Sequence, residues 1–334
     1  MKYGRIITKE RLKYYEVADN VFAAISPNRG LSWANAGFIN KGKGLVYDTF
    51  FDLPHARELK RFCVEMGGRA PTYVVCSHYN ADHTWGNQEF SDSVIIMHKN
   101  AVREHFSEDP KAWDSIIREG QNGGPGEQWI HNELKGFDLT GVRWQDPDIL
   151  IEANTKIMLN DMEVDVISVA PSHSDSDLLL WLPKEKVVFC GDVVFGGAIA
   201  YSAKGIKLWT GALDFIINEL KPEVVIPGHG AICGLDFVKE CKDYFETVMS
   251  EFEKHYDEES SALEIAKRCD ISRFLHLLEP YRLFINILAL TNDRRGVPTK
   301  PDWNYFAEEM AKLKEFQDQK YGVQSWDPMS SWAE

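Results

Sequence analysis

Several features are missing from this 334-residue chain, and each absence narrows the class of protein. No apolar run of about 18 residues occurs, so no transmembrane helix is predicted. The first ten residues are charged and lack the apolar region of a secretory signal. The default expectation is a cytoplasmic protein without a membrane partner.

Cysteine is scarce and scattered. The chain has 6 cysteines and no Cys-x-x-Cys pair, and most of these residues lie within apolar runs: Cys63, Cys76, Cys190, Cys233, Cys241 and Cys269. We interpret them as buried, reduced thiols.

Positive charge is also in short supply. Lysine and arginine number 37 against 51 acidic residues, which gives a net charge of −14. An acidic chain repels a phosphate backbone, so no nucleic-acid partner is expected. A hydrophobic content of 44% and a charged content of 26% are typical of a soluble globular protein with a substantial core.

The densest group of potential metal ligands follows a β-branched and aromatic run at residues 72–76, which predicts a buried strand. Directly after it, His78, Asn80, Asp82 and His83 lie within six residues. Side chains two apart on an extended segment point the same way, so His78 and Asn80 can face one ion. Asp82 and His83, beyond the turn, can reach a second position nearby.

Three further strand patterns end in a potential ligand. Residues 166–169 lead to His173, residues 187–190 lead to Asp192, and residues 224–226 lead to His229 within a Pro-Gly-His-Gly sequence. Imidazole and carboxylate ligands suit zinc, and they also accept iron or manganese. Four ligand-bearing strand ends in one chain are far more specific than any one of them.

In this order the four segments resemble the metallo-β-lactamase-fold hydrolases, in particular the glyoxalase II and lactonase-like branch. The first segment matches the His-x-His-x-Asp-His signature, except that Asn80 stands where the family has its second histidine. The resemblance implies an α/β fold, an αββα four-layer sandwich. It also implies one metal site with His78, Asn80 and His173, a second with Asp82, His83 and His229, and Asp192 bridging the two.

The implied chemistry is hydrolysis by a metal-activated hydroxide at one or two Zn²⁺ ions per chain, with Asp82 as the catalytic residue that orients the attacking oxygen or relays a proton. The true β-lactamases of the family have cysteine at the position of Asp192, whereas esterase, thioesterase and lactonase relatives have aspartate. We therefore expect a small-molecule substrate that is an ester, a thioester or a lactone. Asp48, which ends a predicted strand, matches a family aspartate that supports the site.

Asn80 leaves several alternatives open. A neutral amide oxygen is a poorer zinc ligand than imidazole, which predicts unequal occupancy of the two sites. Otherwise the first site takes a harder ion, hydrolysis is lost, or a histidine from elsewhere substitutes: His98, His105 or His131. The alternative functions are a phosphodiester or phosphotriester hydrolase, a di-iron redox protein and a degenerate binding protein on the same fold.

We divide the chain into a catalytic domain at residues 1–233, with an insertion at about residues 99–146, and a helical C-terminal extension at residues 234–334. Glycine is absent from residue 235 to residue 295, as expected for consecutive helices. The extension is expected to cap the site, form a homodimer or shield a sheet edge, and Trp326 and Trp332 in its tail suggest docking. The glycine-rich residues 120–126 predict a loop.

Helices are expected at residues 53–66, 100–119, 208–220, 235–256, 262–268, 281–291 and 303–320. Five aromatic residues are candidates for a substrate pocket, with core packing as the alternative: Trp33, Tyr79, Trp85, Tyr201 and Trp209.

Overall fold

Two β-sheets lie side by side in one part of the molecule in the computed structural model, which describes residues 3–27, 30–105, 107–300 and 302–322. The first sheet has the order β1-β2-β3-β4-β5-β6-β7-β8 and the second the order β14-β12-β11-β10-β9. The strands of the first sheet are β1 (Ile6–Thr8), β2 (Lys13–Ala18), β3 (Val21–Ile25), β4 (Ala36–Ile39), β5 (Leu45–Tyr47), β6 (Tyr73–Val75), β7 (Val94–His98) and β8 (Ile149–Ile151). Those of the second are β9 (Thr155–Leu159), β10 (Met162–Ser168), β11 (Leu178–Leu182), β12 (Val187–Phe189) and β14 (Val224–Ile226).

The two sheets pack face to face because alternate residues of each strand are apolar toward the other sheet. In β11, Leu178, Leu180 and Leu182 belong to the core cluster between the sheets, whereas Leu179 and Trp181 belong to the cluster on the outer face. Gly37 in β4 allows close approach, since a Cβ there would lie 2.3 Å from the Phe189 ring. Each sheet therefore buries both of its faces.

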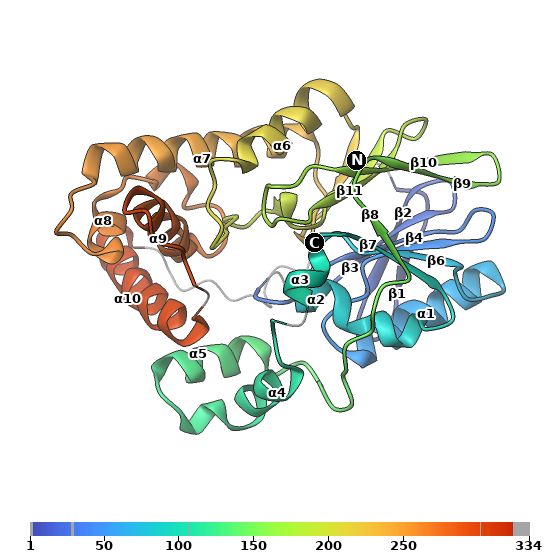
Figure 1. The fold of residues 1–334 in the computed structure, drawn as a ribbon, viewed down its shortest axis with the longest axis horizontal. Helices are drawn as coiled ribbons and strands as arrows, with labels where there is room; N and C mark the ends of the chain where they lie inside the picture. The colour runs from blue at the N-terminus through green and yellow to red at the C-terminus, as the bar shows by residue number, and fades with distance from the viewer. Residues whose placement is uncertain (1–2, 28–29, 106, 301, 323–334) are drawn as a thin grey trace.

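Helices cover both outer faces, which completes the four expected layers (Figure 1). Helix α1 (Leu53–Gly67) packs on the first sheet through residues such as Leu59 and Phe62. On the second sheet lie α6 (Trp209–Phe215), its π-helical continuation η4 (Ile216–Leu220) and α7 (Leu235–His255). Outer-face residues of β11 share one core cluster with α6 and α7. The predicted αββα fold is confirmed.

The remaining helices form two groups beside the sandwich. The C-terminal group comprises α8 (Ala262–Arg268), the short η5 (Ser272–Phe274) and η6 (Pro280–Arg282), α9 (Leu283–Arg294) and α10 (Trp303–Tyr321). The insertion after β7 contains α3 (Ala101–His105), α4 (Pro110–Glu119), η2 (Gly120–Asn122) and α5 (Pro125–Leu134). Ile130 and Leu134 of α5 share a small core with Ala307 of α10, so the two groups meet on one side of the molecule (Figure 1).

The site is carried by short elements at strand ends: α2 (Ala81–Thr84), η1 (Trp85–Phe90), η3 (Gly191–Val193), β13 (Phe195–Gly196) and β15 (His229–Gly230). The last two strands pair with each other in parallel.

Most helices lie where the sequence predicts them, with two corrections. The helix expected at residues 100–119 is two helices, because Asp109 caps a new helix whose first residue is Pro110. The prediction of a loop at residues 120–126 was wrong in part, because the segment contains a 3₁₀ turn and α5 begins at Pro125. The Glu127 side chain accepts from Gly124 N–H at the start of this helix. Among the strands of the two large sheets, the sequence did not predict β1, β2 and β9.

The apolar core does not divide at residue 233, since Val238 and Phe245 of α7 belong to the same cluster as Val188 of β12. The division into two domains stays a prediction, as does the homodimer. All six cysteines are free thiols, and all but Cys233 are buried.

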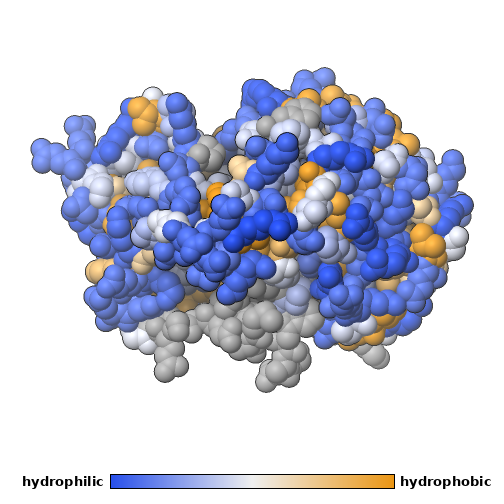
Figure 2. Space-filling model, turned by 90° about the horizontal axis from the view of Figure 1, so that it is seen from below, coloured by the Kyte–Doolittle hydropathy of each residue, from blue (hydrophilic) through white to orange (hydrophobic). Residues whose placement is uncertain are grey.

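Across the described ranges, no helix has both the length and the apolar character needed to cross a bilayer. The face in Figure 2 shows hydrophobic residues scattered among hydrophilic ones, the ordinary pattern of a protein surface. Trp326 and Trp332 lie outside the described residues.

Candidate metal centre and its cavity

Five strands end at the edge where the candidate ligands gather. β5 and β6 run parallel, and so do β12 and β14. β10 runs in the same direction as β12 and β14, because both β10 and β12 are antiparallel to β11. The residues that follow these strands therefore meet at one edge, where sites in such sheets usually form.

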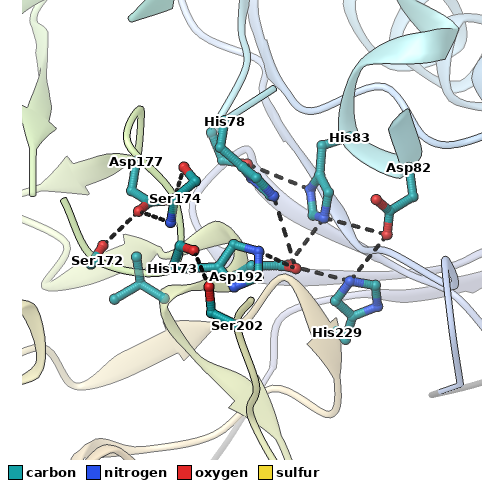
Figure 3. Close-up of polar contacts among 12 residues, drawn as sticks. His78, Asp82, His83, Ser172, His173, Ser174, Asp177, Asp192, Ser202 and His229 are labelled. Atoms are coloured by element: carbon teal, nitrogen blue, oxygen red, sulfur yellow. Dashed lines mark hydrogen bonds and ion pairs between the residues drawn. The ribbon is translucent and has the colours of Figure 1, made fainter. Parts of the chain in front are cut away.

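The Asp192 carboxylate lies between two groups of histidines (Figure 3). Its Oδ1 is 3.0 Å from His83 Nε2 and 3.3 Å from His229 Nε2. Its Oδ2 is 3.6 Å from His173 Nε2 and 3.9 Å from His78 Nε2. One carboxylate thus presents one oxygen to each half of the site.

Asp82 completes the second half. Its Oδ2 lies 3.2 Å from His229 Nε2 and 3.7 Å from His83 Nε2. Gly228 is required beside this group, because a Cβ there would lie 2.1 Å from Asp192 Oδ1. The Pro-Gly-His-Gly sequence therefore lets β14 end against Asp192 while His229 enters the site.

Two histidine rings are oriented by polar contacts at Nδ1, the ring nitrogen that faces away from Asp192. Asp48 Oδ2 lies 2.8 Å from His83 Nδ1, and Ser77 Oγ lies 2.9 Å from His78 Nδ1. Both rings therefore turn Nε2 toward Asp192. Asp48 has the supporting position expected from the sequence.

Asn80 lies at the N-terminus of α2 and lines the cavity in front of the site. Its Oδ1 is buried and has no hydrogen-bond partner. Neither His98 nor His131 belongs to the ligand clusters of the described residues: His98 Nδ1 accepts from Asn100 N–H, and His131 Nδ1 faces the Ile117 carbonyl. The structure does not describe the His105 side chain.

Burial and mutual contacts strongly perturb the titration of the cluster. Burial, reinforced by the charge of His83, holds the pKa of His78 well below its ordinary value. Burial acts the same way on His229, but the Asp192 and Asp82 carboxylates outweigh it and raise the pKa of His229 to about 9. Burial would raise the pKa of Asp192, but the charges of His229 and His83 hold it well below its usual range.

The donors fit a divalent cation. His78 Nε2, His83 Nε2 and Asp192 Oδ1 are buried without a hydrogen-bond partner, although they face one another. Two groups have ligand atoms within 4.8 Å of one another: His78, His83 and Asp192, and Asp82, His83 and His229. Buried polar atoms normally have partners, and a cation among these nitrogens and carboxylates would supply them.

A cavity of about 710 Å³ opens in front of the site. Asn80, Asp82, His173, Asp192 and His229 line its floor. Its apolar walls come from the insertion (Trp113 and Ile116), from the C-terminal helices (Ile285, Trp303 and Phe306) and from Phe51, which precedes α1. The C-terminal helices therefore cover the site.

Of the five aromatic residues expected in a pocket, Tyr79 and Tyr201 line the cavity. For the other three the alternative holds, because they pack against other residues: Trp85 stacks on Phe51, Trp209 donates to the Val193 carbonyl, and Trp33 contacts Phe137.

Among the cavity residues that the sequence analysis missed are Glu108, Trp113, Arg282 and Trp303. Arg282 is buried, forms an ion pair with Glu279, and lies 4.9 Å from the Tyr201 ring centroid. Trp113 and Trp303, from the insertion and α10, have ring centroids 6.0 Å apart. No local pattern marks these residues, because their role arises only from long-range packing.

Solved structures with the same architecture include the sec-alkylsulfatase Pisa1 from Pseudomonas sp., with a TM-score of 0.64 and 16% identity over 84% of this chain and 50% of that chain. The metallo-beta-lactamase FIM-1 from Pseudomonas aeruginosa gives a TM-score of 0.52 and 14% identity over 71% of this chain and 96% of that one. At these identities the likeness concerns the fold alone.

Curated relatives are the acyl-coenzyme A thioesterases MBLAC2 of Homo sapiens and Bos taurus. The human protein is 26% identical over 174 residues, which are 49% of this chain and 58% of the relative. The bovine protein is 26% identical over 171 residues, which are 48% of this chain and 56% of the relative. The chain thus spans less than two thirds of their length.

The family model of the metallo-beta-lactamase superfamily matches residues 31–229. The matched segment is more than half of the chain, and it contains the four strand ends that meet at Asp192 together with all the candidate ligands. The chain belongs to the metallo-beta-lactamase superfamily.

Proposed function

We propose that this protein is a metal-dependent hydrolase that cleaves an acyl thioester, or a related ester or lactone, of a small molecule. One observation carries the proposal: the Asp192 carboxylate presents one oxygen to His83 and His229 and the other to His78 and His173. This arrangement supports two adjacent cation sites joined by a single carboxylate.

The proposed ligands are His78, Asn80 and His173 for the first ion, Asp82, His83 and His229 for the second, and Asp192 for both. Divalent cations bound there would act as a Lewis acid and would lower the pKa of water, so no serine or cysteine nucleophile would be needed. We propose zinc as the metal, with iron and manganese as alternatives.

The protein's own groups position the reactants. Asp82 lies at the floor of the cavity, with a side chain 14% exposed, next to His229. A carboxylate there orients an attacking water molecule and accepts its proton. His83 and His78 are held in place by Asp48 and Ser77, so the ligands are arranged before a substrate arrives.

The cavity supports an acyl substrate. Aromatic and aliphatic side chains form its walls while polar groups are concentrated at its floor, which is the arrangement that suits an apolar acyl group with its carbonyl at the metal centre. The similarity to acyl-coenzyme A thioesterases favours a thioester over an oxygen ester or a lactone.

The test is hydrolysis by protein loaded separately with zinc, manganese or iron, measured against panels of acyl thioesters, aryl esters, lactones and phosphodiesters. We expect turnover of thioesters, and we expect Asp82→Asn to lower kcat about 100-fold or more. Asp165→Asn is the matched control, because Asp165 is a carboxylate on β10 that pairs with Lys156 away from the site.

Turnover of phosphodiesters alone would replace the acyl proposal with the phosphoester alternative. Equal turnover by Asp82→Asn and the control, or none by any metal form, would refute the hydrolytic mechanism.

A further inference from the structure

His173 has the most exposed side chain of the four histidines, although its ring packs against Trp209 with 5.2 Å between the ring centroids. It follows β10 on a loop, and its side chain is 11% exposed, compared with 0% for His78 and His83 and 4% for His229. His173 Nδ1 has no hydrogen-bond partner. His229 Nδ1 also lacks one, but His229 lies in β15, which pairs with β13.

The backbone of His173 is held instead. Ser202 Oγ donates to the His173 carbonyl oxygen at 2.6 Å (Figure 3). The same Oγ accepts from Lys204 N–H at 3.0 Å, so the direction of its own proton is fixed toward His173. Ser202 is buried beside the cavity that it helps to line.

Ser202 is in turn held by the C-terminal helices. Asn286 of α9, which is fully buried, accepts from Ser202 N–H through Oδ1 at 3.2 Å. Its Nδ2 donates to the Ala200 carbonyl at 2.9 Å and to Tyr244 Oη of α7 at 3.2 Å. A series of hydrogen bonds therefore runs from α7 through Asn286 and Ser202 to His173.

The other side of the His173 loop is fixed by contacts within the loop and by the insertion. From the insertion, Asn100 Nδ2 donates to the Asp175 carbonyl at 3.0 Å and Arg103 pairs with the Asp175 carboxylate at 3.3 Å. Lys204 also pairs with that carboxylate, at 3.1 Å. Asp177 accepts from Ser172 Oγ at 2.7 Å and from Ser174 N–H at 2.6 Å, and all three residues are buried. Asp177 shapes the loop, whereas Ser202 alone of these groups connects it to the C-terminal helices.

We propose that Ser202 and Asn286 are positioning residues through which the C-terminal helices set the metal affinity of the first half-site. The proposal rests on the metal centre proposed above. The first half-site depends on this support because Asn80 supplies only a neutral oxygen, which leaves His173 and His78 as its two imidazoles. The second half-site is oriented by other groups, such as Asp48 behind His83.

The experiment measures zinc binding to apoprotein by competition with a chromophoric chelator, and zinc content by mass spectrometry at fixed free zinc. Ser202→Ala and Asn286→Ala are expected to weaken the weaker zinc site about 10-fold to 100-fold, the usual effect of removing an outer partner of a ligand, and to change the tighter site less than about 2-fold. Ser202→Thr, which keeps the hydroxyl, is expected to restore binding.

Matched controls separate positioning from general destabilisation. Ser93→Ala removes a buried hydroxyl that donates to the Pro71 carbonyl at 2.6 Å, and Thr291→Val removes one from α9 itself that donates to the Ile287 carbonyl at 2.7 Å. Both variants are expected to bind zinc as the parent does, whatever their melting temperatures.

A double-mutant cycle identifies the route. If Ser202 acts through His173, Ser202→Ala has no further effect on zinc binding once His173→Ala is present. Additive effects, equal weakening of both sites, or Ser202→Thr binding as poorly as Ser202→Ala would overturn the proposal.

Failure of the metal centre gives a different result. Parent protein that binds none of zinc, manganese and iron would overturn both proposals. Parent protein that binds zinc and hydrolyses thioesters, with Ser202→Ala and Asn286→Ala indistinguishable from it in zinc affinity, would overturn only the positioning role.

Discussion

Asp48 orients His83 through a hydrogen bond of 2.8 Å between Asp48 Oδ2 and His83 Nδ1. The other oxygen of Asp48 accepts from Ser77 N–H at 2.6 Å, so the same buried carboxylate also fixes the strand end that carries His78. One residue outside the ligand set therefore connects both halves of the candidate centre.

Asp48→Asn should weaken zinc binding. The amide would still fill the space of the carboxylate, but the variant would lose the charge that stabilises the proton on His83 Nδ1, so we expect the zinc affinity of the second half-site to fall about 10-fold to 100-fold. Chelator competition on apoprotein measures the change, with Asp165→Asn as the control. Unchanged affinity would show that ring orientation does not depend on this carboxylate.

Asn80→His should tighten the first half-site. Imidazole is a better zinc ligand than an amide oxygen, so a second zinc equivalent should remain bound through dialysis that removes it from the parent protein. Metal content by mass spectrometry after gentle purification gives the answer. Two tightly held zinc ions in the unaltered protein would contradict the expectation of unequal occupancy.

Trp113→Ala and Trp303→Ala should change the preference for acyl chain length. Each removes an aromatic wall of the cavity, and losing that contact costs about 1–2 kcal/mol, or roughly a 10-fold rise in KM for long acyl substrates. Substrates with a two-carbon acyl group should be affected less. Trp144→Ala is the control, since Trp144 is 36% exposed and does not line the cavity. The same loss for short and long chains would argue against an acyl pocket.

Glu108 should make the stability of the apoprotein depend on pH. Burial, with a contribution from the Asp82 charge, raises the pKa of Glu108 from 4.5 to about 7. A carboxyl group with a raised pKa binds more protons in the folded state than in the unfolded state. Its contribution to the free energy of unfolding therefore falls as pH rises from about 4.5 to 7, by at most on the order of 3 kcal/mol.

Denaturant unfolding of the apoprotein, in the presence of a chelator, at pH 5 and pH 7 measures how much the free energy of unfolding falls with pH. This fall should be smaller in Glu108→Gln. An unchanged fall in that variant would assign the pH dependence to other groups.

Local patterns in the sequence predicted the strands that lead to the candidate ligands, and the resemblance of their order to the metallo-β-lactamase-fold hydrolases predicted the sandwich. The assignment of the ligands stays a prediction. The strands that lead to His78, Asp192 and His229 are short apolar runs, the strand before His173 alternates apolar and polar residues, and each ligand follows its strand within a few residues. The edge strands β1 and β9 were not predicted. Exposed residues such as Ile6 and Met158 are apolar, so these strands do not alternate between buried apolar and exposed polar residues.

The cavity could not be predicted in this way. Trp113 and Trp303 belong to amphipathic helices that differ little from ordinary surface helices, and their rings meet because α4 and α10 both pack on α5. The role of Asn286 could not be predicted either. It is a single asparagine in an apolar helix, and the sequence does not indicate that it hydrogen-bonds to Ser202 on a distant loop.

Trp113 and Trp303, which contact each other, are proposed to set the substrate preference. The metal chemistry is proposed to depend on other residues, whereas many enzymes use the same residues for both properties. Both walls are contributed by segments outside the strand ends that hold the ligands, so sequence drift in the insertion or in α10 can reshape the substrate space while the metal chemistry is inherited unchanged. To transfer substrate preference between homologues, the insertion and α10 should therefore be exchanged together. Either segment alone would pack against a segment that it does not fit.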